Sequence, residues 1–521
     1  MTQSFKDIRQ GKMIHRLWVL YPVVFVSGFV VMVIELLGTR VIAPFFGTSL
    51  YVWASIISVT MIALAIGYYL GGVWSDRAKV SPLPLVLLFS GGTVLLIPAL
   101  APLVLPWADP MGLRLGAFVS CLILFLPSLC LLGMVGPTVI NHVAAVHPGL
   151  IGRSVGLIYA ISTIGSVAGT LVLAFFLFPS FGSTSILLGA GETLVLTAMG
   201  VLGIGFPVRR WWVIFLAIAF VMAGLIQMKT NAEDRFKSAR GFSTLSEEES
   251  LYGWVRVLDN PERDMRLLAS DASVIGAARI SDGKSLLFYQ KIIESIPLLR
   301  PEVKRALLIG QGAGHIANEL HQRFGIVVDT IELDPSVANA AESSFGFQAS
   351  GKRLVGDARY EIRKLDGPYD LVIHDCFTGG TEPTHLLTKE AFQEAKRLLS
   401  PQGILALNYV AIYEWGKNKG LASVYRTLGQ VFTHRLVIAE NPQHELGDFV
   451  FLASASNMNL EQSKTMQKEV QSLIDRTVFV DETSGDLISD DYNPLEHYQL
   501  QKAESYRSLV VGWLGSTLMT R

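Results

Sequence analysis

Cysteine is scarce in this 521-residue chain, and Cys121, Cys130 and Cys376 do not predict a structural disulfide. An excess of charge of one sign is also lacking. The 43 Lys and Arg residues balance 44 Asp and Glu residues, which gives a formal net charge of −1. The first absence excludes a disulfide-stapled secreted module. The second excludes the strongly basic composition of a nucleic-acid binder, so no nucleic-acid partner is predicted.

Charged residues are nearly missing from the first 228 positions. This segment holds 11 Lys and Arg and 5 Asp and Glu residues, about 7% of its length, whereas the other 293 residues hold 32 and 39, about 24%. A soluble globular protein has about 25% charged residues. The contrast excludes a single soluble domain and a disordered chain. It divides the protein into a slightly basic apolar half and an acidic polar half.

Apolar runs long enough to cross about 30 Å of hydrocarbon recur throughout the first half. The first run is too long for a signal-peptide core and is followed by others, so we do not expect it to be cleaved. Small residues at 165–169 favour close helix–helix approach in lipid. We therefore predict a polytopic α-helical membrane domain at 1–228, with the lipid bilayer as a partner. Its seven expected helices lie near 17–37, 50–74, 83–104, 114–135, 155–179, 184–206 and 211–228.

Two charged residues, Glu35 and Arg40, stand near the end of the first apolar run. Pro44 and Gly47 follow them, and the spacing predicts that the helix ends between the two charges. Two interpretations are open. The pair could lie at the interface, with Arg40 reaching toward the headgroups. It could instead form a polar site that faces the interior of the bundle, since ionisable groups inside membranes are costly and usually functional.

The sequence pattern of the second half predicts an α/β protein. Residues 229–303 are predicted as a linker and a small β-rich segment, with strands at 253–258, 265–270 and 274–280. Residues 304–460 alternate between strands and helices, which predicts a Rossmann-like, methyltransferase-type domain with buried parallel strands. Residues 461–521 form a C-terminal tail whose apolar end is too short to span a membrane. Strands of the Rossmann-like domain are expected at 306–309, 326–333, 353–355, 369–374 and 404–410, with an antiparallel pair at 435–439 and 449–453.

A glycine-rich turn follows the first strand of that domain. Gly310, Gly312 and Gly314 would let the backbone turn tightly and approach a nucleotide at a helix start. Glu332 stands 22 residues after Gly310 at a strand end, where a carboxylate can accept both ribose hydroxyls.

Two further aspartates, Asp357 and Asp375, end the third and fourth strands. Asp357 could accept a hydrogen bond from the amino group of adenine. Carboxyl ends of parallel strands meet at one edge of a sheet, so these acids should converge with the glycine turn. The alternative is that they only cap the helices that follow.

Residues 245–410 resemble the spermidine synthase family, the polyamine aminopropyltransferases. The first half resembles the membrane domain fused to some bacterial members, on the run from Glu35 through Arg40 to Trp53. The motifs that carry the first resemblance are Tyr252-Gly253, Phe288-Tyr289-Gln290, Ile309–Gly314, Ile331-Glu332-Leu333-Asp334, Gly356-Asp357-Ala358 and Tyr369–Asp375.

The resemblance implies a reaction and a set of roles. An aminopropyl group would move from decarboxylated S-adenosylmethionine to an amine, leaving methylthioadenosine. Asp375 would be the catalytic base, and Tyr289 would orient the amine and the base. The donor would lie against Gln290, Gly310, Gly312, Gly314, Glu332, Asp357 and Ala358.

The sequence departs from the family at two carboxylates. Thr378 stands where the family has a second aspartate that holds the amine, and Ala313 replaces the acid that grips the donor's ammonium. Glycine loops without that acid are usual in enzymes that use intact S-adenosylmethionine. Asp490 and Asp491 lie in an acidic tail that could cover the site and supply the missing charges, or could form a solvated turn.

Three functions therefore stay open. The first is a membrane-bound aminopropyltransferase with altered amine choice. The second is a related S-adenosylmethionine-dependent methyltransferase or lyase. The third is a transporter or sensor whose soluble domain binds an adenosyl ligand without turnover. His374 and His385 show no spacing typical of metal ligands, so no metal is expected.

The expected location is the bacterial inner membrane, with several crossings. Positive residues place the N-terminal tail in the cytoplasm, so seven crossings would put the second half outside. The donor nucleotide is made in the cytoplasm, which favours the opposite side for a catalytic domain. We expect the cytoplasmic side. The sequence leaves the oligomeric state open, a homo-oligomer included.

Overall fold

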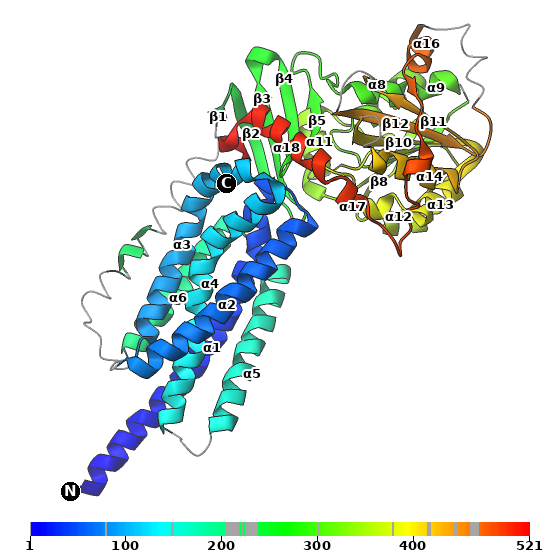
Figure 1. The fold of residues 1–521 in the computed structure, drawn as a ribbon. Helices are drawn as coiled ribbons and strands as arrows, with labels where there is room; N and C mark the ends of the chain where they lie inside the picture. The colour runs from blue at the N-terminus through cyan, green and yellow to red at the C-terminus, as the bar shows by residue number, and fades with distance from the viewer. Residues whose placement is uncertain are drawn as a thin grey trace. The chain divides into compact units, whose positions relative to one another are not determined.

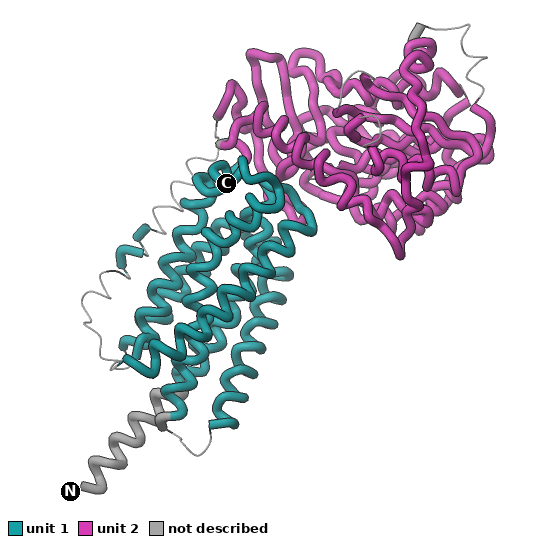
Figure 2. Tube along the Cα trace, viewed as in Figure 1, with its two compact units in different colours: residues 1–235, 520–521 teal, residues 236–519 magenta. Residues whose placement is uncertain are grey.

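A computed structural model describes residues 2–78, 81–146, 151–203, 238–300, 302–377, 380–413, 418–441, 446–458 and 468–520, with six further positions between 216 and 223. The chain divides into two compact units, Met1–Arg235 with Thr520–Arg521, and Phe236–Met519 (Figure 2).

The first unit is helical (Figure 1). Five stretches of its described residues are long and apolar enough to cross a membrane. The longest, Leu83–Ala144, contains two consecutive helices that a 3-10 turn at Asp109–Met111 separates. The helices are α1 (Thr2–Phe46), α2 (Leu50–Arg77), α3 (Leu83–Ala108), α4 (Gly112–Val146), α5 (Ile151–Val172, continued by a π-helical turn at Leu173–Leu177) and α6 (Ser183–Gly203).

Each of the first six predicted membrane helices overlaps one of these elements. The seventh, at 211–228, lies outside the described residues apart from six positions. The predicted helix end between Glu35 and Arg40 is wrong, because α1 continues to Phe46. Ile42, Phe45 and Phe46 are fully buried, so tertiary packing holds the last turn in place beyond the charges.

Glu35 and Arg40 are both half-buried within α1. The Arg40 guanidinium carbon lies 5.4 Å from the centroid of the Phe178 ring. The polar-site interpretation of this pair stays a prediction.

Glycines bring helix backbones into contact at two places. A Cβ atom on Gly165 of α5 would lie 2.2 Å from the carbonyl oxygen of Phe25 in α1, as the small residues at 165–169 predict. On α2, a Cβ on Gly67 would lie 2.2 Å from the carbonyl oxygen of Cys130 in α4. Only glycine allows these two approaches.

The second unit begins with a five-stranded antiparallel sheet in the order β1-β2-β3-β4-β5. Three of its strands match the predicted ones, but β1 and β2 are missing from the prediction. Most side chains of β2 are polar and exposed, so this strand lacks the alternation that identifies a half-buried strand. The strands are β1 (Ser238–Ala239), β2 (Phe242–Glu249), β3 (Trp254–Asn260), β4 (Met265–Ser270) and β5 (Ser273–Ala278).

The larger sheet has eight strands in the order β13-β11-β12-β10-β9-β6-β7-β8. Its central pairs are parallel, and β12 runs antiparallel to both β10 and β11. The predicted antiparallel pair is confirmed, with Arg435 opposite Ala453 and Ala439 opposite Phe449. The strands are β6 (Arg305–Ile309), β7 (Val327–Glu332), β8 (Arg353–Val355), β9 (Tyr369–His374), β10 (Leu399–Ile412), β11 (His434–Ala439), β12 (Leu446–Ser454) and β13 (Thr477–Val478).

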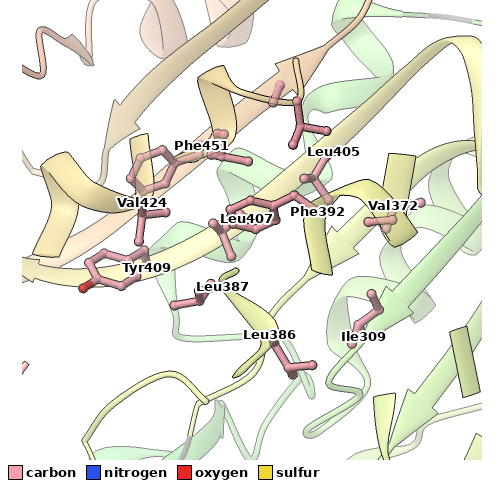
Figure 3. Close-up of a cluster of buried hydrophobic side chains, with 14 of the residues drawn as sticks. Ile309, Val372, Leu386, Leu387, Phe392, Leu405, Leu407, Tyr409, Val424 and Phe451 are labelled. Atoms are coloured by element: carbon pink, nitrogen blue, oxygen red, sulfur yellow. The ribbon is translucent and has the colours of Figure 1, made fainter. Parts of the chain in front are cut away.

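Helices cover both faces of this sheet, as a doubly wound α/β fold requires. One buried cluster joins the strands to α12, α13 and α14 (Figure 3), and another joins the opposite face to α8, α9 and α10. The helices are α8 (Phe288–Glu294), α9 (Ile296–Leu299), α10 (His315–Phe324), α11 (Pro335–Phe345), α12 (Ala358–Lys364), α13 (Lys389–Leu398), α14 (Lys419–Gly429), α16 (Lys468–Ile474), α17 (Leu495–Tyr498), α18 (Leu500–Leu514) and α19 (Ser516–Met519).

The two glycines Gly67 and Gly72 give a matched test of the α2–α4 contact. Gly67→Ala should lower the midpoint of thermal unfolding of the detergent-solubilised chain, because its methyl group would collide with backbone and cost about 1–3 kcal/mol. Gly72 has open space around it, so Gly72→Ala should leave the midpoint unchanged or raise it slightly. Equal midpoints for the two variants would contradict the close packing.

Candidate active site

The glycine turn links β6 to α10 at the centre of the large sheet. Gly310, Gly312 and Gly314 have φ angles of 87°, 52° and 79°, in the left-handed region that favours glycine. A Cβ atom on Gly310 would lie 2.2 Å from the carbonyl oxygen of Asp375. The turn therefore reaches Asp375 only because Gly310 has no side chain, and the predicted convergence of these two motifs is confirmed.

Ala313 is buried at the far side of the same turn, where its methyl group packs beside Gly276 of β5. It belongs to a small apolar cluster with Val257 and Leu268 of the antiparallel sheet. The turn thus carries no carboxylate at this position, and its surroundings are apolar.

Glu332 ends β7 beside the glycine turn. Its two carboxylate oxygens accept the backbone N–H groups of Gly312 and Asp334, each at 3.1 Å. Burial raises the pKa of Glu332 to about 7, although these hydrogen bonds favour the charged form. The side chain therefore lies against the glycine turn, and its role as a ribose ligand stays a prediction.

Asp357 is the N-cap of α12, where its Oδ1 accepts the N–H of Tyr360 at 3.0 Å. Its other oxygen lies 3.8 Å from Nε2 of His385, and both side chains are about half exposed. Ala358 is buried as the first residue of the helix. One Asp357 oxygen therefore caps α12, as the alternative interpretation predicts. The role of Asp357 in binding adenine stays a prediction.

Asp375 follows β9 and lies at the end of a short hydrogen-bonded chain. The Tyr289 hydroxyl of α8 donates to Asp375 Oδ2 at 3.0 Å, and Gln290 Nε2 donates to the Tyr289 oxygen at 3.4 Å. The Ser285 hydroxyl donates to Gln290 Oε1 at 2.6 Å. The three predicted residues Asp375, Tyr289 and Gln290 are brought together.

The sequence prediction missed Asn408 and Asp448, which complete this arrangement. Asn408 of β10 donates from Nδ2 to Asp375 Oδ1 at 3.1 Å and to Asp448 Oδ1 at 3.2 Å. One signal was available, since Asn408 is the one polar residue in the apolar run 404–410 apart from the tyrosine beside it. Asp448 gave no such signal, because the sequence just before it, 440–445, is mostly polar.

Burial raises the pKa of Asp375 to about 6, and the nearby charge of Glu382 adds to the increase. The hydrogen bonds from Asn408 and Tyr289 oppose this shift because they favour the carboxylate. A carboxyl group with a pKa just below neutrality can accept a proton at neutral pH and still release it, as general acid–base chemistry requires.

A buried ion pair fixes the C-terminal helix next to this region. Lys502 of α18 pairs with Glu382, and both side chains are nearly inaccessible. Glu382 also accepts the N–H of Val410 at 2.7 Å and an N–H of Gln499 at 3.1 Å. Burial raises the pKa of Glu382 and lowers that of Lys502, while their attraction opposes both changes. The charge of Lys502 is therefore already matched.

The predicted substrate-binding residues are not gathered in one place. Thr378 lies outside the described residues. The Asp490 carboxylate accepts hydrogen bonds from Arg359 at 3.0 and 2.9 Å and from the Thr388 hydroxyl at 2.7 Å. Asp491 is exposed. Asp490 thus ties the tail to α12 and to the start of α13, and a role of either acid in substrate binding stays a prediction.

In the part of the chain that the structure describes, no group of three or more His, Cys, Asp or Glu side chains could hold a metal ion.

Comparison with known proteins gives the site a context. No family model matches the chain. It is 30% identical over 241 residues to a polyamine aminopropyltransferase of Vibrio vulnificus, covering 44% of this chain and 78% of that relative. It is 27% identical over 243 residues to an N-terminal histidine N-methyltransferase of Emericella nidulans, covering 42% of each. A solved probable spermidine synthase from Corynebacterium glutamicum has 19% identity and a TM-score of 0.39, covering 46% of this chain and 90% of its own.

The α/β unit with its glycine turn and strand-end carboxylates is that of a transferase with a methyltransferase-type fold. The similarity to the Vibrio relative goes further, because it extends over more than three quarters of that protein. The chain belongs to the polyamine aminopropyltransferase family. Membership in a family of enzymes favours catalysis over the non-catalytic transporter or sensor.

Gly310→Ala should abolish transferase activity and lower the midpoint of thermal unfolding by several degrees. The variant combines left-handed backbone strain with a collision against the Asp375 carbonyl, at a cost of about 3 kcal/mol or more. Gly346→Ala is the matched control, since Gly346 has a φ of 68° but open space around it, so only the strain of about 1 kcal/mol should appear. Equal losses in the two variants would show that the close approach to Asp375 is not needed.

Proposed function

We propose that this chain is a membrane-bound, spermidine synthase-like transferase that moves an aminopropyl group from decarboxylated S-adenosylmethionine to an amine. The observation that carries the proposal is the buried Tyr289–Asp375–Asn408 arrangement beside the glycine turn. A carboxylate held by two donors, and with a pKa of about 6, is suited to accept the proton of an ammonium group.

The proposed reaction needs no covalent bond between the protein and either substrate. An ammonium proton passes to Asp375, and the freed nitrogen lone pair attacks the methylene carbon next to the sulfonium. The carbon–sulfur bond breaks, its electron pair goes to sulfur, and neutral methylthioadenosine leaves. The protein contributes position and electrostatics: Tyr289 fixes the carboxylate, and Asn408 holds its other oxygen.

The donor nucleotide fits the residues around the glycine turn. Each carboxylate oxygen of Glu332 accepts one backbone N–H group and has capacity for a further hydrogen bond, which a ribose hydroxyl can donate. The Asp357 side chain is about half exposed, and its Oδ2, which lies 3.8 Å from Nε2 of His385, is the proposed acceptor for an adenine amino group. The left-handed φ angles of Gly310, Gly312 and Gly314 let the chain turn tightly into α10, whose free N–H groups a nucleotide can approach. These contacts support an adenosyl co-substrate.

A second function, methyl transfer from intact S-adenosylmethionine, is favoured by one observation. The turn carries Ala313 in an apolar environment, so it has no carboxylate for the ammonium of a decarboxylated donor. The similarity to the Emericella methyltransferase agrees with this alternative. The two functions differ in their products, methylthioadenosine and S-adenosylhomocysteine.

We place the enzyme in the bacterial inner membrane through its apolar helices, with the α/β unit on the cytoplasmic side. The donor is a charged nucleotide made in the cytoplasm, and this supply favours that side over the outer face. The acceptor is a small amine.

Asp375→Asn tests the proposed base directly. The variant keeps the shape and one acceptor oxygen but cannot take a proton, so the rate of methylthioadenosine release should fall by about 10²–10⁴. Binding of methylthioadenosine, measured by calorimetry on the detergent-solubilised chain, should change less than threefold. A rate within tenfold of the unsubstituted enzyme would remove Asp375 from the mechanism.

The pH dependence tests the same group. Asp375 is protonated below about pH 6, so kcat/KM for the amine should fall tenfold per pH unit below that value and level off above it. Tyr289→Phe removes a hydrogen bond that favours the carboxylate, and the lower inflection should move to higher pH. An inflection that stays in place in Tyr289→Phe would show that another group is being titrated.

A further inference from the structure

A second carboxylate lies beside the proposed base, contributed by a different strand. Asp448 stands on β12 opposite Val410 of β10, and β10 pairs in turn with β9, which ends just before Asp375. The carboxyl ends of β9 and β10 and the start of β12 therefore meet at one edge of the sheet. Asp375, Asn408 and Asp448 come from three adjacent strands at this edge.

The Asn408 amide joins the two acids. Its single nitrogen donates to Asp375 at 3.1 Å and to Asp448 at 3.2 Å. Asn408 is only 6% exposed, and its Oδ1 has no hydrogen-bond partner within the described residues. A buried amide oxygen without a donor is costly, which indicates a ligand with N–H groups at this position. The two carboxylates and the Asn408 oxygen are all acceptors, and they suit an ammonium group, which has three donors and no acceptor.

The acids at this edge are not matched by a salt bridge of their own. Among the described side chains, no salt bridge includes Asp375 or Asp448. Lys502 is the nearby cation, and Glu382 already neutralises it. The half-buried Asp448 also lies beside Glu440, and burial together with these acidic neighbours raises its pKa. A bound cation would relieve this repulsion.

We propose that Asp448 is a specificity-determining residue that binds the second cationic nitrogen of a diamine acceptor. This inference rests on the proposed amine alkylation at Asp375. The family resemblance implies an amine-binding aspartate at position 378, where this chain has threonine. On our proposal, Asp448 of β12 supplies that negative charge instead. The first nitrogen of the diamine is then deprotonated at Asp375, while the other stays charged at Asp448.

The test compares 1,4-diaminobutane with 1-aminobutane, which has the same length but lacks the second ammonium. With the full chain in detergent and decarboxylated S-adenosylmethionine, Asp448→Asn should raise KM for the diamine at least tenfold and leave its kcat within threefold. KM for the monoamine should change less than twofold. Asp481→Asn, which removes the same charge at an exposed cap, should leave both KM values unchanged.

The outcomes separate the inference from the proposed function. If the unsubstituted chain releases no methylthioadenosine with either amine, the proposed function fails. If it does, but Asp448→Asn affects the two amines equally or weakens only donor binding, the role of Asp448 is overturned. Should Asp448→Asn not fold, Asp448→Glu keeps the charge and extends it by one methylene. This variant should shift the preference toward 1,3-diaminopropane, and an unchanged preference would contradict the proposal.

Discussion

The site depends on one constraint, which is that the half-buried carboxylate of Asp375 must be stabilised without a salt bridge from any described side chain. Burial disfavours the charged form, and only hydrogen-bond donors in fixed positions compensate. Tyr289 and Asn408 supply these donors from α8 and β10. Gly310 brings the turn against the Asp375 backbone. In the sheet, β9 lies between β6 and β10, so the residue that follows β9 can contact the glycine turn on one side and Asn408 on the other.

The C-terminal segment is part of the same structure. Lys502 and Glu382 form a buried ion pair that joins α18 to the segment after β9, and Tyr506 packs edge-on against Phe377 with ring centroids 4.9 Å apart. Breaking a buried pair by removing one partner leaves an uncompensated charge, which typically costs about 3–5 kcal/mol. The tail therefore supports the site through packing and charge, in addition to any role of its exposed acids.

Much of this arrangement could be predicted from the sequence, because it depends on local patterns. The parallel strands are continuous apolar runs, the glycine turn follows a strand, and Tyr289, Glu332 and Asp375 stand within recognisable motifs. What could not be predicted depends on contacts between distant segments. The pairing of β10 with β12 sets Asn408 beside Asp448, and no local pattern fixes that register. Likewise, Asp490 meets Arg359 across 131 positions. The helix α1 extends past its predicted end because buried aromatic packing outweighs the signal of Pro44.

The near-zero net charge conceals two halves with different chemistry. The apolar half carries helices long enough for a membrane, and the acidic half concentrates carboxylates around one edge of a sheet. In the proposed function, those carboxylates bind a cationic amine acceptor and the nucleotide part of a decarboxylated donor. The most direct measurement gives the full chain 1,4-diaminobutane with equal concentrations of decarboxylated and intact S-adenosylmethionine, and quantifies the products by mass spectrometry. The account predicts methylthioadenosine in equal amount to an aminopropylated amine. Accumulation of S-adenosylhomocysteine with a methylated product, and no methylthioadenosine, would contradict it.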